Sequence, residues 1–385
     1  MVRSEDPMFQ TQPRMTPART LPAPGAGPED FFALTPAEFS EQLRASGLPA
    51  FRAKQVLAWV YRRYEASFEA MTDLSAADRT ALSGRYALEP PVISQVSRSS
   101  DGVTDKLLLR LCDGLPVEGV VMLHPRRRPT LCVSMQVGCA QGCLFCATGT
   151  MGLVRNMTAG EIVGQIWQLR RYLLRERGVE QVPTLVFMGM GEPLDNEPNL
   201  RQALEVLNGP AGFGLASRKI TVSTVGGPDK ILALAGLGLQ VQLAVSLHAA
   251  SDDLRGRLVP GQRGVSVKAL VDAAREFFRK TGREVTFEYV VIERVNDSVE
   301  EAVRLARLLD GFQCKVNLIP LNPVGHNRMQ PPTSGVLRRF EATLTTRGVK
   351  CTVRHSQGRD ILAACGQLAT RSQRREDDDP GRRCA

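Results

Sequence analysis

The chain has 385 residues, a length that suits one large domain with a smaller attachment or two domains of ordinary size. Its composition, 43% hydrophobic and 23% charged, is ordinary for a soluble globular protein. No apolar run is long enough to cross a bilayer, so we expect no membrane role. The net charge of +9 favours a polyanionic partner, although a basic surface without such a partner has the same composition.

The two ends of the chain have the composition of disordered segments. Residues 1–30 are rich in proline and polar residues and lack the apolar core of a secretory signal, so we expect a disordered leader and a cytoplasmic protein. The charged residues 370–385 predict a disordered tail. In a cytoplasmic chain, nine cysteines do not indicate a disulfide framework, and clustered cysteines point to a metal or to catalysis.

Residues 31–90 predict a small helical domain. The sequence TPAE at 35–38 has the form of a capping box with proline at the first helical position, and it opens a helix to about Leu43. A second amphipathic helix is predicted within residues 51–64. Taken alone, its arginines favour a solvated face over an RNA contact. In the context of the whole chain, we expect this domain to bind RNA.

Residues 91–130 are rich in alternating β-type segments and predict a strand-containing bridge. In residues 131–369, six short apolar runs alternate with helical patterns. This alternation predicts an α/β fold, a partial (βα)6 TIM-like barrel whose functional site lies at the carboxyl ends of its strands. The predicted strands lie within residues 131–137, 184–190, 219–225, 241–248, 285–292 and 315–321.

Three cysteines follow the first predicted barrel strand. Cys139, Cys143 and Cys146 form a C-x3-C-x2-C arrangement on one loop, and thiolates bind iron strongly. With three local protein ligands, one iron of a [4Fe-4S] cluster is left for S-adenosylmethionine (SAM) to chelate. The alternative, a structural zinc site, usually has four protein ligands and a different spacing.

The cysteine loop and the run FMGMGEP at 187–193 together resemble the radical SAM superfamily. Further matches, in order from about Phe32 to Leu368, make the chain similar to the RlmN/Cfr family of adenine methyltransferases, and most similar to its RlmN branch. These matches include FRAKQVLAWVY, LCVS ahead of the cysteine loop, TVSTVGG, SLH, Asn322-Pro323 and ACGQL at 364–368.

The resemblance implies a set of functional residues. Cys365 would accept a methyl group from SAM, Cys132 would later pair with Cys365 as a disulfide, and Glu118 would accept a proton. The SAM contacts implied by the same resemblance are Gly191, Glu192, Ser223, Ser246, Leu247, His248 and Asn322. Without the resemblance, Cys132 reads as a small core residue, His248 as a satisfied polar group and Glu118 as an ordinary strand carboxylate.

The family chemistry implies two uses of SAM. One SAM methylates Cys365, and reductive cleavage of a second at the cluster yields a radical that activates the S-methyl group for addition to C2 of adenine. The expected substrates are 23S rRNA and tRNA. The expected partners are an electron donor such as flavodoxin or ferredoxin and a thiol reductant. The target base would have to leave its stack to react.

Three other functions stay open on the sequence. They are a C8-directed methyltransferase of the Cfr branch, a radical SAM peptide maturase and an RNA-binding protein with a structural metal. The arginine run at 125–129 could hold phosphates. This run and residues 354–358 are where the chain departs from the family pattern, which bears on substrate preference.

Overall fold

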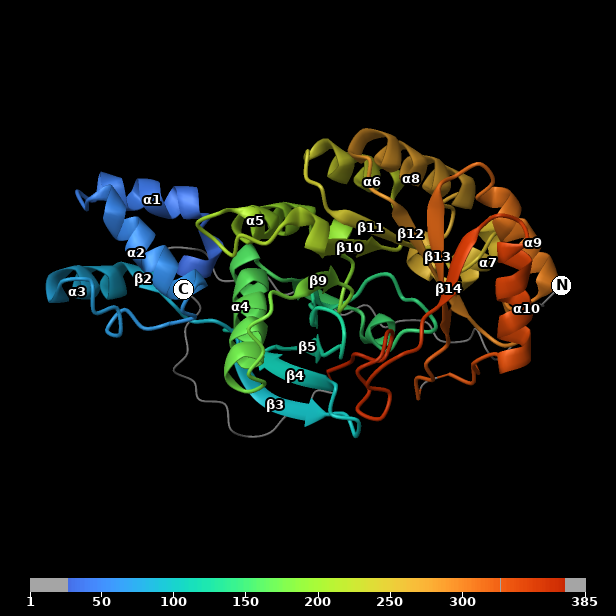
Figure 1. Ribbon diagram of the computed structural model, residues 1–385, viewed down its shortest axis with the longest axis horizontal. Helices are drawn as coiled ribbons and strands as arrows, with labels where there is room; N and C mark the ends of the chain where they lie inside the picture. The colour runs from blue at the N-terminus through green and yellow to red at the C-terminus, as the bar shows by residue number, and fades with distance from the viewer. Residues whose placement is uncertain (1–26, 326, 371–385) are drawn as a thin grey trace.

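A ten-stranded sheet organises the protein, whose computed structural model describes residues 27–325 and 327–370 (Figure 1). The strand order is β14-β13-β12-β11-β10-β9-β6-β5-β4-β3, and the strands from β6 to β14 in this order run parallel. The parallel strands are β6 (Thr130–Cys132), β9 (Thr184–Phe187), β10 (Ile220–Thr224), β11 (Gln242–Ser246), β12 (Val285–Val291), β13 (Cys314–Pro320) and β14 (Lys350–Val353).

The predicted α/β fold with six βα units is confirmed, because each of the six predicted segments overlaps one of the parallel strands β6, β9, β10, β11, β12 and β13. The sheet has one parallel strand more than predicted, β14, and its order ends at β14 and β3. The helices that follow the strands are α4 (Ala159–Arg175), α5 (Glu197–Asn208), α6 (Pro228–Gly236), α7 (Asp252–Leu258), α8 (Val267–Thr281), α9 (Val299–Leu308) and α10 (Ser334–Thr345).

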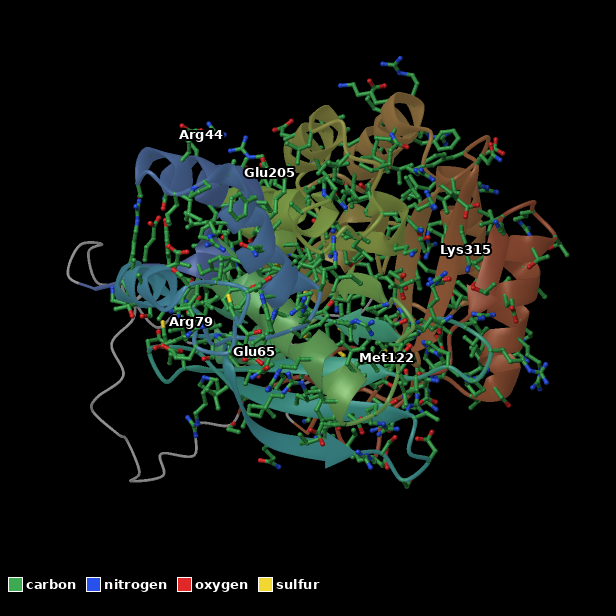
Figure 2. The ribbon with its side chains drawn as sticks, turned by 60° about the vertical axis from the view of Figure 1, so that its left-hand side comes forward. Arg44, Glu65, Arg79, Met122, Glu205 and Lys315 are labelled. Atoms are coloured by element: carbon green, nitrogen blue, oxygen red, sulfur yellow. The ribbon has the colours of Figure 1, made fainter. Side chains whose placement is uncertain are left out.

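The N-terminal helices form a separate group at one end of the molecule (Figure 1). They are α1 (Pro36–Ala45), α2 (Ala50–Tyr61) and α3 (Ala76–Arg85), beside a small parallel pair of β1 (Glu29–Asp30) and β2 (Tyr86–Ala87). The predicted capping box is confirmed, since the side chains of Thr35 and Glu38 each accept a hydrogen bond from the other residue's backbone N–H. Figure 2 shows Arg44 and Arg79 of this group at the far end from Lys315 on β13.

A buried tryptophan joins the helical group to the barrel. Trp167 on α4 is 1% exposed, and its Nε1 donates a 2.8 Å hydrogen bond to the carbonyl of Val60 on α2. The ring of Phe32 packs against it with centroids 5.7 Å apart. A shared apolar core therefore fixes α2 against α4.

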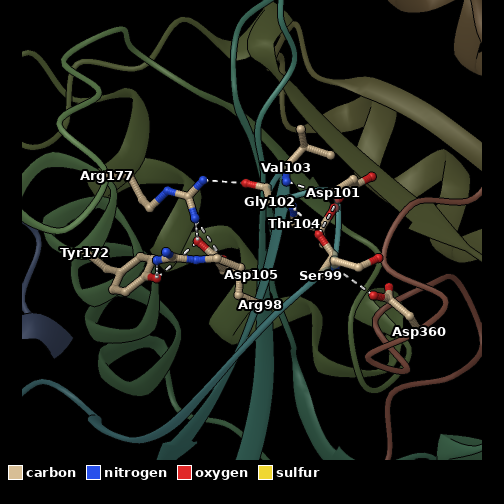
Figure 3. A network of polar contacts seen from close by, with 11 residues as sticks. Arg98, Ser99, Asp101, Gly102, Val103, Thr104, Asp105, Tyr172, Arg177 and Asp360 are labelled. Carbon is tan, nitrogen blue, oxygen red and sulfur yellow. Dashed lines mark hydrogen bonds and ion pairs between the residues drawn. The ribbon is translucent and has the colours of Figure 1, made fainter.

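The three strands of residues 91–130 continue the barrel sheet rather than standing apart from it. They are β3 (Val92–Arg98), β4 (Thr104–Arg110) and β5 (Pro116–Met122), all antiparallel, and β5 pairs with β6. At their edge the carboxylate of Asp105, which is 1% exposed, binds Arg98 and Arg177 (Figure 3). The same hairpin contacts the C-terminal segment, because the Ser100 amide donates to Asp360 at 2.7 Å.

Disordered ends and the lack of a membrane role were also expected from the sequence. The predicted leader and tail lie almost entirely outside residues 27–325 and 327–370. Within those residues, no helix combines the length and apolarity needed to span a bilayer.

Candidate active site

One cavity opens at the carboxyl ends of the parallel strands. Most of the residues that the sequence singles out line it: Cys139, Cys143, Cys146, Gly191, Glu192, Ser223, Ser246, His248, Asn322 and Cys365. Glu118, Cys132 and Leu247 lie outside its lining. Residues up to 226 positions apart (365 − 139) thus meet in one place.

The three loop cysteines follow β7 (Gln136–Gly138), a short strand that pairs with β8 (Leu153–Asn156). Cys139 and Cys143 are buried, and all three thiols are free. The loop is tightly packed, because a Cβ at Gly149 would lie 2.8 Å from the carbonyl oxygen of Cys143. Hydrogen bonds hold it as well, with the Cys146 amide donating to Cys143 at 3.1 Å.

The donor set fits an iron–sulfur cluster. Three thiols reach one cavity from a single loop, and in a cubane each thiolate binds its own iron. Cys139, Cys143 and Cys146 would therefore hold the cluster.

Glu192 fixes the loops at the cavity rather than presenting a free carboxylate. It is 3% exposed, and its two oxygens accept hydrogen bonds from the amides of Leu194, at 3.0 Å, and Val225, at 2.9 Å. Burial raises the pKa of Glu192 to about 7. Gly191 has φ of +94°, and a Cβ there would meet the side chain of Gln136 at 2.5 Å, so this turn requires glycine.

His248 is a neutral hydrogen-bond donor in the cavity wall. Its Nδ1 accepts from the amide of Val290 at 3.1 Å, which leaves the proton on Nε2. Burial lowers the pKa of His248 to about 3, and its ring packs edge-on against Phe145 with centroids 4.7 Å apart. Its backbone has φ of +61°, in the left-handed region, which turns the side chain back into the cavity.

Ser223 and Ser246 reach the cavity from neighbouring strands, β10 and β11. Leu247 does not, because its side chain is fully buried in the main apolar core. The amide of Leu247 donates a 3.0 Å hydrogen bond to the carbonyl of Glu288. Its place next to Ser246 and His248 therefore serves packing and strand alignment.

Two thiols and a guanidinium interact electrostatically at the cavity. Cys365 lines the cavity, and Cys132, which is 8% exposed, ends β6 behind it. Both are free thiols here, so the implied disulfide is absent from this structure. Burial, and secondarily Cys365, raise the pKa of Cys132 to about 12, whereas Arg354 acts to lower it. The charge of Cys365 is the main factor that raises the pKa of Arg354.

The C-terminal segment that carries Cys365 is docked on the cysteine loop. The amide of Ala147 donates to the carbonyl of Gly366 at 2.7 Å, and the Thr148 hydroxyl donates to the carbonyl of Leu368 at 2.6 Å. These bonds come from the residues directly after Cys146. The loop and the segment therefore form one wall of the cavity.

Asn322 holds the same segment from the other side. It is 3% exposed, and its Nδ2 donates to the carbonyl of Cys365 at 3.0 Å. Its Oδ1 accepts from Nε of Arg359 at 2.8 Å. Both ends of the amide are thus used to place Cys365.

Glu118 connects the segment to the antiparallel strands. Its carboxylate, 6% exposed, forms an ion pair with Nζ of Lys106 at 3.0 Å and accepts from the amide of Ala369 at 2.9 Å. Lys106 also donates to the carbonyl of Leu362 at 3.3 Å. A buried carboxylate therefore lies at the end of the segment and is paired with a lysine whose side chain is 15% exposed.

Two charged residues of the cavity, Glu288 and Arg354, were not predicted from the sequence as functional candidates. Glu288 was visible as the one charged residue in the apolar run VTFEYVVI. Arg354 was noted only as part of a stretch that departs from the family. Neither has a local motif, so only the fold shows that both face the cavity.

Comparison with known proteins gives consistent similarities. A profile of the Radical SAM superfamily matches residues 133–306, and one of the ribosomal RNA large subunit methyltransferase N-terminal domain matches residues 30–88. The chain is 40% identical to the dual-specificity RNA methyltransferase RlmN of Sulfurovum, over 87% of this chain and 95% of that protein. It is 43% identical to ribosomal RNA large subunit methyltransferase N of Nitrosopumilus maritimus, over 89% and 98%. A solved radical SAM methyltransferase from Sphaerobacter thermophilus matches with a TM-score of 0.85 at 47% identity, over 89% of this chain and 99% of that one.

Proposed function

Since the chain belongs to the RlmN family of radical SAM RNA methyltransferases, we propose that it methylates C2 of an adenine in 23S rRNA and in tRNA through a methylated cysteine. The family predicted from the sequence is confirmed. The observation that carries the proposal is the cavity itself. It brings the three cysteines of the loop, the thiol of Cys365 and, directly behind it, the thiol of Cys132 to one place.

The chain's own groups have distinct tasks in this reaction. When bound, the cluster and SAM supply a one-electron reductive cleavage that generates the hydrogen-abstracting radical. As a thiolate, Cys365 attacks the methyl carbon of a first SAM and releases S-adenosylhomocysteine, and the S-methyl carbon, after losing one hydrogen atom, later bonds to C2 of the adenine. Arg354 places a guanidinium beside Cys365, and Cys365 is the main factor that raises the pKa of Arg354.

Release of the product needs a base and a second thiol. After the adduct radical has given one electron to an iron–sulfur acceptor, Glu118, whose carboxylate is ion-paired with Lys106, accepts the C2 proton. Cys132 then attacks the sulfur of Cys365 and a disulfide forms, while the transferred carbon keeps the electron pair of the broken S–C bond and takes up a proton to become the methyl group. An external thiol reductant reopens the disulfide.

The net charge of the chain and its N-terminal helical domain support an RNA partner. The net charge of +9 suits a polyanion, and the N-terminal region matches the domain found in rRNA methyltransferases. An electron donor such as flavodoxin or ferredoxin would reduce the cluster.

The test separates the two thiols. In the reconstituted enzyme with SAM, reductant and 23S rRNA, Cys132→Ala should accumulate a protein–RNA adduct that survives denaturation and thiols, because its link is a thioether. Cys365→Ala should leave the RNA unreacted, and the double variant should form no adduct. Cys314→Ala, at a buried thiol away from the cavity, is the matched control. Normal turnover by Cys132→Ala would contradict the thiol roles, and product methylated at C8 would assign the alternative chemistry of the Cfr branch.

A further inference from the structure

A row of polar side chains crosses the sheet beneath the cavity. Glu288 on β12 lies in register with Ser246 on β11 and with Asn317 on β13, and Asn317 lies in register with Thr352 on β14. Nδ2 of Asn317 donates to Oε1 of Glu288 at 3.0 Å, and the Thr352 hydroxyl donates to Oδ1 of Asn317 at 2.9 Å. The row therefore fixes one carboxylate oxygen of Glu288.

The other carboxylate oxygen of Glu288 has no protein partner. The residue is 5% exposed and lines the cavity, yet Oε2 is buried and makes no hydrogen bond within the described part of the chain. Buried polar atoms in native proteins are nearly always satisfied. An unpartnered carboxylate oxygen that faces a ligand cavity indicates a donor on the ligand.

A donor faces the same cavity from the end of β14, two strands away from Glu288. Arg354 directly follows β14, where its amide donates to the carbonyl of Leu318 at 2.8 Å, and its side chain lines the cavity beside Cys365. Nη1 lies 3.9 Å from the sulfur of Met188. The cavity thus presents an acceptor at Glu288 and a guanidinium donor at Arg354, with the guanidinium on the side of Cys365.

This arrangement matches one edge of adenine. The 6-amino group is a donor, the adjacent N1 is an acceptor, and C2 is bonded to N1. Enzymes that react with an extruded base commonly recognise this edge. In guanine both polarities are reversed, since O6 is an acceptor and N1 carries a proton.

We propose that Glu288 accepts a hydrogen bond from the 6-amino group of the target adenine while Arg354 donates to its N1, which places C2 against Cys365. The inference rests on the proposed function and adds to it the residues that select the base and the carbon. C8, at the far end of the purine, then lies away from Cys365. A base without a 6-amino group leaves Oε2 unsatisfied and binds less well.

The test combines Glu288→Gln with a change in the RNA. Asn317 holds the carbonyl of the new glutamine, so its NH2 group would face the cavity and oppose the 6-amino group. The substrates are a 23S rRNA fragment with adenine at the target position and the same fragment with purine, which lacks the 6-amino group. They compete for the cluster-loaded enzyme, and the ratio of their kcat/KM values and their Kd values are measured. We expect wild type to favour adenine by about ten- to a hundredfold.

The variant should lose that preference while its affinity for SAM stays at the wild-type value. Glu284→Gln, on the preceding turn and paired with Lys350 at the surface, is the matched control and should keep the preference. Arg354→Gln with 1-deazaadenine RNA tests the N1 contact in the same way. Equal use of both RNAs by wild type would overturn the proposal, and this result needs no variant to fold.

Two further outcomes distinguish the possible failures. If Glu288→Gln binds SAM at least tenfold more weakly and still favours adenine, the carboxylate belongs to the SAM site and the proposal is wrong. If wild type methylates no RNA at all, the proposed function fails, and this inference fails with it.

Discussion

Replacing Asn322 with leucine should loosen the segment that carries Cys365 without unfolding the protein. The substitution keeps the branching and the number of heavy atoms of the side chain and removes both of its hydrogen bonds. The bond to Arg359 contributes little, because that guanidinium is exposed and water can replace the amide. The bond to the carbonyl of Cys365 decides the effect, since its loss leaves a partly buried acceptor unsatisfied.

Such a loss costs about 1–3 kcal/mol. At 1.4 kcal/mol for each factor of ten, opening of the segment should become roughly 5- to 140-fold more frequent. The amides of Ala147 and Ala369 report this opening, because each makes a hydrogen bond between the segment and the rest of the protein. Ala147 donates to Gly366 of the segment, and Ala369 of the segment donates to Glu118. Hydrogen exchange measured by mass spectrometry should show both amides exchanging faster by that factor.

The control is Asn208→Leu, which removes an equivalent bond, from Nδ2 to the carbonyl of Leu215 at 2.7 Å, far from the cavity. It should leave the exchange of Ala147 and Ala369 unchanged. Unchanged exchange in Asn322→Leu would refute the role of Asn322 in holding the segment. Equal acceleration in both variants would show a general loss of stability instead.

Three other outcomes follow from the fold and the site. Alanine at Cys139, Cys143 or Cys146 should abolish the cluster absorbance of anaerobically reconstituted protein, and full iron content in all three variants would exclude this loop as the cluster site. Trp167→Ala should lower the free energy of unfolding by about 3–5 kcal/mol in urea titrations, and a loss below about 1 kcal/mol would show that α2 and α4 are not coupled through this ring. Burial raises the pKa of Asp30 from 3.8 to about 6, so the folded protein binds this proton more tightly and stability should fall as pH rises from about 4 to 6. Asp30→Asn should lack that part of the pH dependence in titrations across this window.

Local sequence signals predicted the elements of the fold well. The capping box of Thr35 and Glu38 determines its helix through contacts within four residues, and the parallel strands contain short runs of buried apolar residues. Pairing between distant segments was harder to predict. Nothing in the residues of β5 shows that it pairs with β6, and β14 is too short and too exposed to stand out from a loop.

The site was predictable where residues are close in sequence or match the family. The cysteine loop is recognisable from eight consecutive residues, and the family pattern indicated Cys365 as a candidate site residue. The contacts that these residues make could not be predicted, because they depend on the fold. Glu192 and Asn322, expected to contact SAM, use their polar atoms to hold backbone segments, and Glu288 and Arg354 meet only because strands β12 and β14 flank β13.

The docking of the C-terminal segment onto the cysteine loop constrains how the enzyme matures. Cys132 and the cysteine loop leave the ribosome long before Cys365, which follows Cys132 by 233 residues (365 − 132). When the segment arrives, the bonds from Ala147 and Thr148 to Gly366 and Leu368 close it over the loop. The wall of the cavity that includes the cysteine loop is therefore completed only by the last part of the chain. A chain that stops before Cys365 lacks both this part of the wall and the thiol proposed to receive the methyl group.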